Sequence, residues 1–290
     1  MPPRDLFLVF IVILAWGSNF TAMKIALEEL PPLLFNGLRF AILIPLIFVL
    51  PRPASWRAVI AIGVFINAGQ FAFLFSAMEA DVTAGLASLL IQAQAPITIV
   101  LAALIYRETV SFAQGMGIAL AVMGLIVFGV SDGGNVTLIG LILVLCGALS
   151  WSCGNLVLRR LAGVQMMALF VWASLIPPLP MLGLSLLFEG PAPLSSIISL
   201  SLQGWLSVLY VAIISTIIGY SIWGALLSRH PASIVTPFAL LIPVVGLLTA
   251  AVVLGETITA MDAVAAAIIL SGIALAILAP RPAKAKGPPG

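Results

Sequence analysis

Charge is the scarcest property of this sequence. Only 8% of its 290 residues are Asp, Glu, Lys or Arg, whereas 62% are hydrophobic. Charged residues make up about a quarter of a typical water-soluble domain, so this composition excludes a soluble globular protein of this size. The long apolar runs instead predict a protein that crosses a membrane several times.

The residues needed for a catalytic centre are also few. The chain has one histidine, His230, in an expected connection, and two cysteines, Cys146 and Cys153. The cysteines are about 10 Å apart along one expected helix, too far for a disulfide. No Asp or Glu falls near the middle of an apolar run, which disfavours paired catalytic carboxylates and a carboxylate proton relay. We therefore expect no enzyme activity, no metal and no cofactor, while coupling to an ion held by carbonyls and hydroxyls stays open.

Ten apolar segments are long enough to be membrane spans. Charges separate between their two ends: one side receives ten of the twelve cations and the other eight of the ten acids. Basic residues mark the cytoplasmic side, so both termini are expected there, with a disordered tail at 281–290. The expected spans are 6–26, 33–50, 57–78, 82–105, 111–131, 137–159, 166–188, 203–227, 232–254 and 260–279.

The sequence also repeats itself. Glu108 and Gly124 in the first half recur as Glu256 and Gly272, at a constant offset of 148 residues. Each half holds five spans, an odd number, so the two copies must have opposite orientations. We predict an all-α integral membrane protein built from two inverted five-helix repeats, an arrangement typical of transporters. The expected boundaries are 1–132 and 133–280.

Polar and aromatic side chains fall near the middle of several spans. An unpaired amide in hydrocarbon costs roughly 4–8 kcal/mol, so these side chains should face a cavity or another helix. For any single residue, a hydrogen bond to a neighbouring helix explains the position equally well. Together, a largely apolar and aromatic lining suits a medium-sized organic solute better than a bare ion. The candidate substrate-binding residues are Trp16, Asn19, Asn67, Gln70, Gln92, Trp151, Asn155, Thr216, Tyr220 and Ser233.

Prolines and one arginine complete the set of unusual residues at depth. Pro96 leaves the carbonyl of Gln92 without its helical partner, and it is expected to act as a hinge together with Pro237 and Pro243. Arg39 lies inside the second span, where a centred arginine costs on the order of 3 kcal/mol. Two explanations stay open for it: it extends to the acidic surface, or it offers its guanidinium to a substrate carboxylate.

Several of these motifs resemble one family. The motifs are Trp16-Gly17-Ser18-Asn19, Leu38-Arg39-Phe40, Pro96…Glu108…Gly117…Gly124 and the second copy Pro243…Glu256…Gly272. Across nearly the whole chain they resemble the EamA-type drug/metabolite transporter superfamily, and most of all its bacterial exporters of aromatic and other neutral amino acids (the YddG type). The resemblance implies ten helices and solute movement, usually export, across a bacterial inner membrane. It also implies that spans 1, 3, 4, 6, 8 and 9 surround a central cavity, while spans 5 and 10 pack outside and support oligomers.

The composition and the motifs support some functions more than others. The leading hypothesis is an inner-membrane carrier that exports amino acids, aromatic or other neutral ones, or similar small metabolites by alternating access. An exporter of other drugs or organic cations is the main alternative. An intramembrane enzyme, a channel and a non-transporting scaffold have less support, because neither catalytic pairs nor a ring of like charges is evident. The expected partners are a small-molecule substrate, the lipid bilayer and a second copy of the chain, but no nucleic acid.

Overall fold

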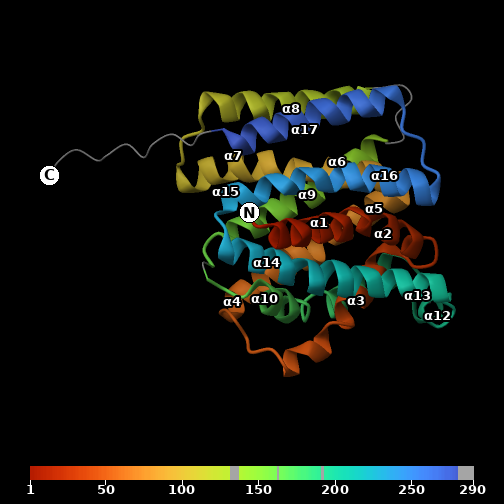
Figure 1. Cartoon of the computed structure of the whole chain (residues 1–290). Helices are drawn as coiled ribbons and strands as arrows, with labels where there is room; N and C mark the ends of the chain where they lie inside the picture. Colours follow the sequence, from red (N-terminus) through yellow and green to blue (C-terminus); the bar gives the residue numbers. More distant parts are fainter. Residues whose placement is uncertain (131–136, 162, 191–192, 280–290) are drawn as a thin grey trace.

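The computed structural model describes residues 1–130, 137–161, 163–190 and 193–279, and they form a bundle of long helices (Figure 1). Seven helical runs are long and apolar enough to cross a membrane, and one pair of helices bent by 44° makes an eighth span. Two shorter apolar helices, Pro32–Phe48 and Phe112–Val127, occupy the second and fifth expected spans. Within the described part of the chain, the ten predicted spans are therefore confirmed. The boundary expected at 132 and the tail 281–290 lie outside the described residues.

Each span of the first repeat is assembled from the following helices. They are α1 (Pro3–Gly17) and α2 (Asn19–Leu27) in span 1; α3 (Pro32–Ala41) and η1 (Ile44–Phe48) in span 2; α4 (Trp56–Ile62), η2 (Gly63–Gln70) and α5 (Phe71–Ala80) in span 3; α6 (Ala84–Leu90), η3 (Ile91–Ala93) and α7 (Gln94–Tyr106) in span 4; and α8 (Phe112–Val130) in span 5.

The second repeat follows the same plan, with α12 (Pro193–Ile198) in the connection before span 8. Its helices are α9 (Leu138–Leu158) in span 6; α10 (Met166–Ala173) and α11 (Pro178–Phe188) in span 7; α13 (Leu202–Leu209), η4 (Tyr210–Ile218) and α14 (Gly219–Arg229) in span 8; α15 (Ala232–Val235), η5 (Thr236–Leu241) and α16 (Ile242–Leu254) in span 9; and α17 (Ala260–Leu278) in span 10.

Irregular helical turns recur at matching positions of the two repeats. Spans 3 and 8 each contain a π-helical stretch, and the offset of 148 carries residues 63–70 of η2 onto 211–218 within η4. Spans 4 and 9 each contain a 3₁₀ turn, and the same offset carries residues 91–93 of η3 onto 239–241 within η5. Because π-helical turns are rare and frequent at functional sites, this recurrence indicates where each repeat carries its function.

The three prolines predicted as hinges lie at these 3₁₀ turns. Pro237 is at the start of η5, and Pro243 is at the start of the α-helix that follows it. Pro96 lies in the first turn of α7, directly after η3. Proline cannot donate the backbone hydrogen bond that would continue an α-helix, which accounts for the local change of helix type. Their action as hinges stays a prediction.

Spans 5 and 10 pack against each other along one edge of the bundle, where α8 and α17 run side by side (Figure 1). A Cβ atom added to Gly117 would lie 2.6 Å from the Gly272 carbonyl oxygen, and one added to Gly272 would lie 2.7 Å from the Gly117 carbonyl oxygen. Only glycine at both positions allows the two backbones to approach so closely.

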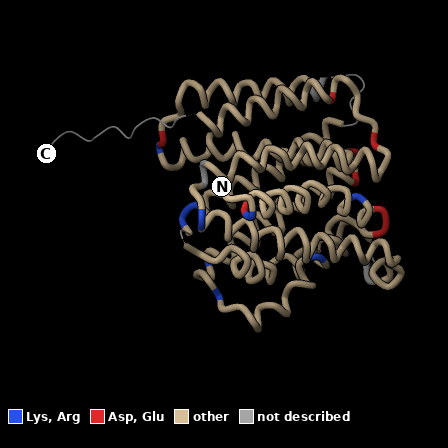
Figure 2. Tube along the Cα trace, in the orientation of Figure 1, with Lys and Arg blue, Asp and Glu red and all other residues tan. Residues whose placement is uncertain are grey.

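Lysine and arginine gather mainly at one end of the bundle, and aspartate and glutamate mainly at the other (Figure 2). The even-numbered spans begin at the acidic end, so their N-termini present free N–H groups there. Four carboxylates accept hydrogen bonds from these N–H groups, each across the boundary between the repeats. The pairs are Glu29 with Ser201 (2.7 Å), Asp81 with Thr137 (2.6 Å), Glu189 with Leu33 (2.6 Å) and Glu256 with Ala84 (2.7 Å). The acidic residues therefore cap helices and join the repeats.

Candidate functional site

Aromatic side chains from three spans meet around Tyr220 in the middle of the bundle. The Tyr220 ring stacks on Phe170 with 3.9 Å between centroids and lies 5.2 Å from the Trp16 ring. The Trp16 indole N–H donates to the Ser215 carbonyl at 2.8 Å. A Cβ atom at Gly219 would lie 3.0 Å from the indole carbon Cε2, so the glycine lets Trp16 lie directly against span 8.

Arg39 lies beside this aromatic group and is 2% exposed. Its Nη2 donates at 2.9 Å to the hydroxyl of Thr216, which lies four residues before Tyr220 in span 8. Its guanidinium carbon lies 3.9 Å from the centroid of the Phe71 ring and 4.9 Å from that of Phe40. The explanation that Arg39 extends to the acidic surface is therefore wrong, because neighbouring spans enclose the side chain.

These residues, together with the buried polar side chains of Asn19, Asn67 and Gln70 on spans 1 and 3, form what we call the central cluster. Its members come from spans 1, 2, 3, 7 and 8. Spans 2 and 7 therefore contribute although the family resemblance did not imply them, whereas spans 4, 6 and 9, which it did imply, contribute no member. The members are Trp16, Asn19, Arg39, Asn67, Gln70, Phe71, Phe170, Thr216 and Tyr220.

Several buried polar atoms of the central cluster have no hydrogen-bond partner among the described residues. A buried polar atom left without a partner costs about 1–3 kcal/mol, and most native structures avoid it. The nitrogens of Asn19 and Asn67 are engaged, with Met23 Sδ at 3.6 Å and the Phe170 carbonyl at 3.4 Å. The atoms without a partner are Asn19 Oδ1, Arg39 Nε and Nη1, Asn67 Oδ1 and Gln70 Oε1.

The other predicted site residues lie at the margin of this cluster or away from it. Trp151 is partly buried and packs in the same apolar group as Tyr220. Gln92, in η3, is 7% exposed, and its side chain makes no hydrogen bond to another described residue. Asn155 is held elsewhere, because its amide donates to Gln94 Oε1 at 2.8 Å and to the Thr98 hydroxyl at 3.3 Å. The Ser233 side chain lies outside the described residues.

Sequence reasoning missed two aromatic members of the central cluster. Phe71 shares a helical face with Asn67 and Gln70, but like Phe170 it lies among many similar apolar residues, and neither was selected. Gln94, which pairs with Asn155, was also not selected. Arg39 carried a visible signal, a lone charge inside an apolar span, but only the three-dimensional contacts decide between its two explanations.

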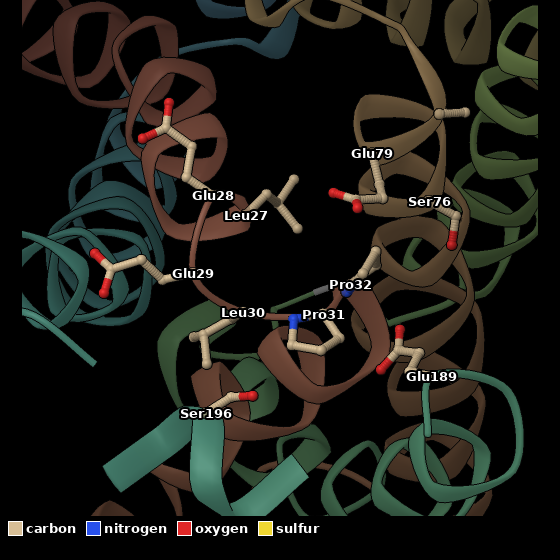
Figure 3. Close-up of a pocket in the computed structure, with 11 residues that line it drawn as sticks. Leu27, Glu28, Glu29, Leu30, Pro31, Pro32, Ser76, Glu79, Glu189 and Ser196 are labelled. Carbon is tan, nitrogen blue, oxygen red and sulfur yellow. The ribbon is translucent and has the colours of Figure 1, made fainter. Parts of the chain in front are cut away.

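An open cavity of about 620 Å³ lies at the acidic end of the bundle (Figure 3). Glu28 and Glu29 lie on one side of it, and Glu79 and Glu189 lie on the other. Hydrogen bonds from the Ser201 hydroxyl and amide lower the pKa of Glu29 from its ordinary value, against a smaller opposing effect of burial. The cavity is thus lined by several carboxylates and shares no residue with the central cluster.

Two smaller hollows lie between helices. One, of about 570 Å³, is mostly apolar and lies between α2, α13 and α16, with Thr21, Tyr210 and Thr249 among its lining residues. The other, of about 180 Å³, contains Gln94 and Asn155 and lies between α7, α8, α9 and α17. No group of three or more His, Cys, Asp or Glu side chains that could hold a metal ion occurs in the described part of the chain.

Comparison with known proteins agrees with this arrangement. The chain is 43% identical over 282 residues to a Salmonella typhimurium LT2 protein named "Probable amino-acid metabolite efflux pump", covering 94% of both chains. It is 38% identical over 283 residues to an Escherichia coli K12 protein of the same name, again covering 94% of both. A crystal structure at 22% identity shares the fold, with a TM-score of 0.62 over 95% of this chain and 97% of the other. The model of the EamA-like transporter family matches residues 4–130 and 138–278, so the chain belongs to the EamA-like transporter family.

Proposed function

We propose that this protein exports amino acids, aromatic or other neutral ones, or similar small metabolites across the bacterial inner membrane by alternating access. The names of the relatives from Salmonella and Escherichia coli support an amino-acid metabolite as the solute. The observation that carries the proposal is the central cluster itself. It joins span 1 to span 8 through Trp16 and Ser215, and span 2 to span 8 through Arg39 and Thr216. Movement of one repeat against the other therefore remodels this cluster.

The chemistry of the central cluster suits a neutral amino acid. The rings of Trp16, Phe170 and Tyr220 offer apolar faces for an aromatic or aliphatic side chain. The unpaired oxygens of Asn19 and Gln70 can accept hydrogen bonds from an ammonium group. An organic cation without a carboxylate fits less well, because it would meet the charge of Arg39 in a region of low dielectric.

The structure also suggests how the repeats move. The outer carboxylate contacts, such as Glu256 with Ala84 and Gly85, link the two repeats at the acidic face. The 3₁₀ turns beside Pro96 and Pro243 supply places where spans 4 and 9 can bend. We propose that bending there opens one face while the other closes, with both termini on the cytoplasmic side, as the distribution of basic residues predicts.

Uptake of labelled phenylalanine into liposomes containing the purified protein tests this proposal. We expect saturable uptake by the wild-type protein. Tyr220→Phe keeps the ring that stacks on Phe170 and should retain most of the uptake. Tyr220→Leu removes the ring and should lower kcat/KM about tenfold, because one aromatic contact contributes roughly 1 kcal/mol to binding. Asn19→Ala and Gln92→Ala should also reduce uptake without unfolding the protein. Flux no greater than in empty liposomes for every amino acid tested, with and without a proton gradient, would contradict the proposal.

A further inference from the structure

We infer that Arg39 binds the carboxylate of the transported solute, so that the site selects compounds with a free carboxylate over the corresponding amines and amides. This inference rests on the proposed function, because it assigns a role within the same site. It goes further by naming the group on the solute that is recognised and the residue that recognises it.

Arg39 has no counter-ion among the described residues. The ion pairs among the described residues lie at the basic end of the bundle: Arg159 with Glu108, and Arg229 and His230 with Asp5. Arg39 forms no such pair, although its side chain is 2% exposed. A buried charge is normally retained only with a partner of opposite charge. An anion that enters with the solute would supply the missing partner.

Arg39 keeps hydrogen-bond donors that no described residue uses. A guanidinium has five N–H groups in one plane, and two of them can bind the two oxygens of a carboxylate at once. Nη2 of Arg39 donates to the Thr216 hydroxyl, which in turn donates to the Val211 carbonyl at 3.1 Å. Nε and Nη1 have no partner in the described part of the structure. Thr216 therefore fixes the plane of the guanidinium and leaves N–H groups for a ligand.

Two aromatic rings lie next to the guanidinium of Arg39. Phe71 and Phe40 lie close to it, an arrangement that holds an arginine by cation–π attraction while leaving its edges free. A purely structural role would account for these ring contacts and for Thr216. It would not account for the two unpaired nitrogens of Arg39, nor for the unpaired acceptor oxygens that Asn19 and Gln70 contribute to the same cluster. Donors for a carboxylate together with acceptors for an ammonium match the two charged groups of an amino acid.

The unpaired nitrogens have almost no accessible surface in this structure. A carboxylate would therefore reach Arg39 only when the repeats separate on one face of the membrane. Closure around the bound solute would then replace water on the carboxylate with the guanidinium. Recognition and closure would thus be coupled at one residue.

Competition by three related compounds tests the inference on the wild-type protein. Unlabelled phenylalanine, phenylalanine amide and phenethylamine are each added outside liposomes during uptake of labelled phenylalanine. We expect phenylalanine to compete at least about tenfold more strongly than the amide or the amine, because each lacks the charged acceptor. Equal competition by all three compounds would overturn the inference while leaving the proposed function intact. Absence of phenylalanine uptake would overturn the proposed function itself, and with it the inference.

Variants at Arg39 provide a second measurement. Arg39→Gln removes the charge and should reduce the preference for phenylalanine over its amide to near unity, whereas Arg39→Lys keeps the charge and should retain part of the preference. The matched control is Lys24→Gln, a cation of span 1 whose Nζ donates to the Met78 carbonyl at 2.7 Å; its preference should stay unchanged. A preserved preference in Arg39→Gln would overturn the inference. If Arg39→Gln does not fold, the three-compound competition on the wild-type protein still tests whether the site prefers a free carboxylate.

Discussion

The guanidinium of Arg39 donates a hydrogen bond to the hydroxyl of Thr216 at 2.9 Å, and the two residues are 177 positions apart in the chain. Arg39 belongs to span 2 of the first repeat, and Thr216 belongs to the π-helical stretch of span 8 in the second. Both side chains are almost fully buried. This contact therefore joins the repeats at the depth where a solute would have to pass between them.

Replacing Thr216 by valine should destabilise the protein. Thr216→Val keeps the shape of the side chain but removes the acceptor of Arg39, which leaves a further buried donor unpaired at a cost of about 1–3 kcal/mol. Thr216→Ser keeps the hydroxyl and should lose less than about 1 kcal/mol. Thermal unfolding of the detergent-purified variants measures the difference. Equal stability of the two variants would show that the contact with Arg39 contributes little.

Replacing Glu256 by glutamine should loosen the acidic face at the start of α6. The Glu256 carboxylate accepts from the amides of Ala84 at 2.7 Å and Gly85 at 2.9 Å. Glu256→Gln removes the charge that favours this helix N-terminus, at a cost of about 1 kcal/mol. Hydrogen exchange of the Ala84 and Gly85 amides should therefore become faster. Glu79→Gln, the same change at an exposed position on the same face, is the control and should leave that exchange unaltered; equal effects of both changes would contradict the prediction.

Adding a methyl group to Gly117 should force α8 and α17 apart. Its Cβ would lie 2.6 Å from the Gly272 carbonyl oxygen, and such overpacking typically costs about 1–3 kcal/mol. Gly115→Ala is the matched control on the same helix, because its Cβ would have no neighbour within 4 Å; it should be neutral or slightly stabilising. Thermal unfolding compares the two variants. A Gly117→Ala protein as stable as Gly115→Ala would show that the helices can separate without cost.

Acid should weaken the contact between Glu29 and the start of α13. Hydrogen bonds from Ser201 lower the pKa of Glu29 in the folded protein below the ordinary value of 4.5. A carboxyl group with a lowered pKa stabilises the folded state above the ordinary value, and this contribution is lost as the pH falls through the lowered pKa. The thermal midpoint of the wild-type protein should therefore fall more steeply below about pH 4.5 than that of Glu29→Gln. Glu28→Gln is the control and should follow the wild-type curve; a Glu29→Gln curve parallel to wild type would contradict the prediction.

The spans and their repetition could be predicted from the sequence because each is a local or periodic property. Apolar runs set the ten spans, and the recurrence of Glu108 as Glu256 set the offset of 148 residues that the π-helical and 3₁₀ turns also follow. Trp16 and Tyr220 could be selected as site residues because polar and aromatic side chains stand out in an apolar span. The structure places the centroids of their rings 5.2 Å apart, and their role in binding a solute stays a prediction.

Other features depend on long-range packing and had no local signal. The π-helical stretches of spans 3 and 8 contain no proline and are mostly apolar, like the flanking α-helices, so the sequence could not distinguish them from α-helix. Phe170 enters the central cluster because α10 packs against α14 and so stacks the ring on Tyr220. Asn155 pairs with Gln94, 61 residues away, although its position favoured the solute site. The choice between the two explanations for Arg39 likewise required the positions of spans 3 and 8.

Counterflow through the reconstituted wild-type protein tests alternating access at the central cluster most directly. Liposomes are loaded with unlabelled phenylalanine and diluted into a trace of the labelled compound. A carrier whose two repeats alternate around one site should show saturable uptake of label that is accelerated by the internal amino acid and rises transiently above equilibrium. Uptake that increases linearly with concentration and is indifferent to the internal amino acid would contradict it.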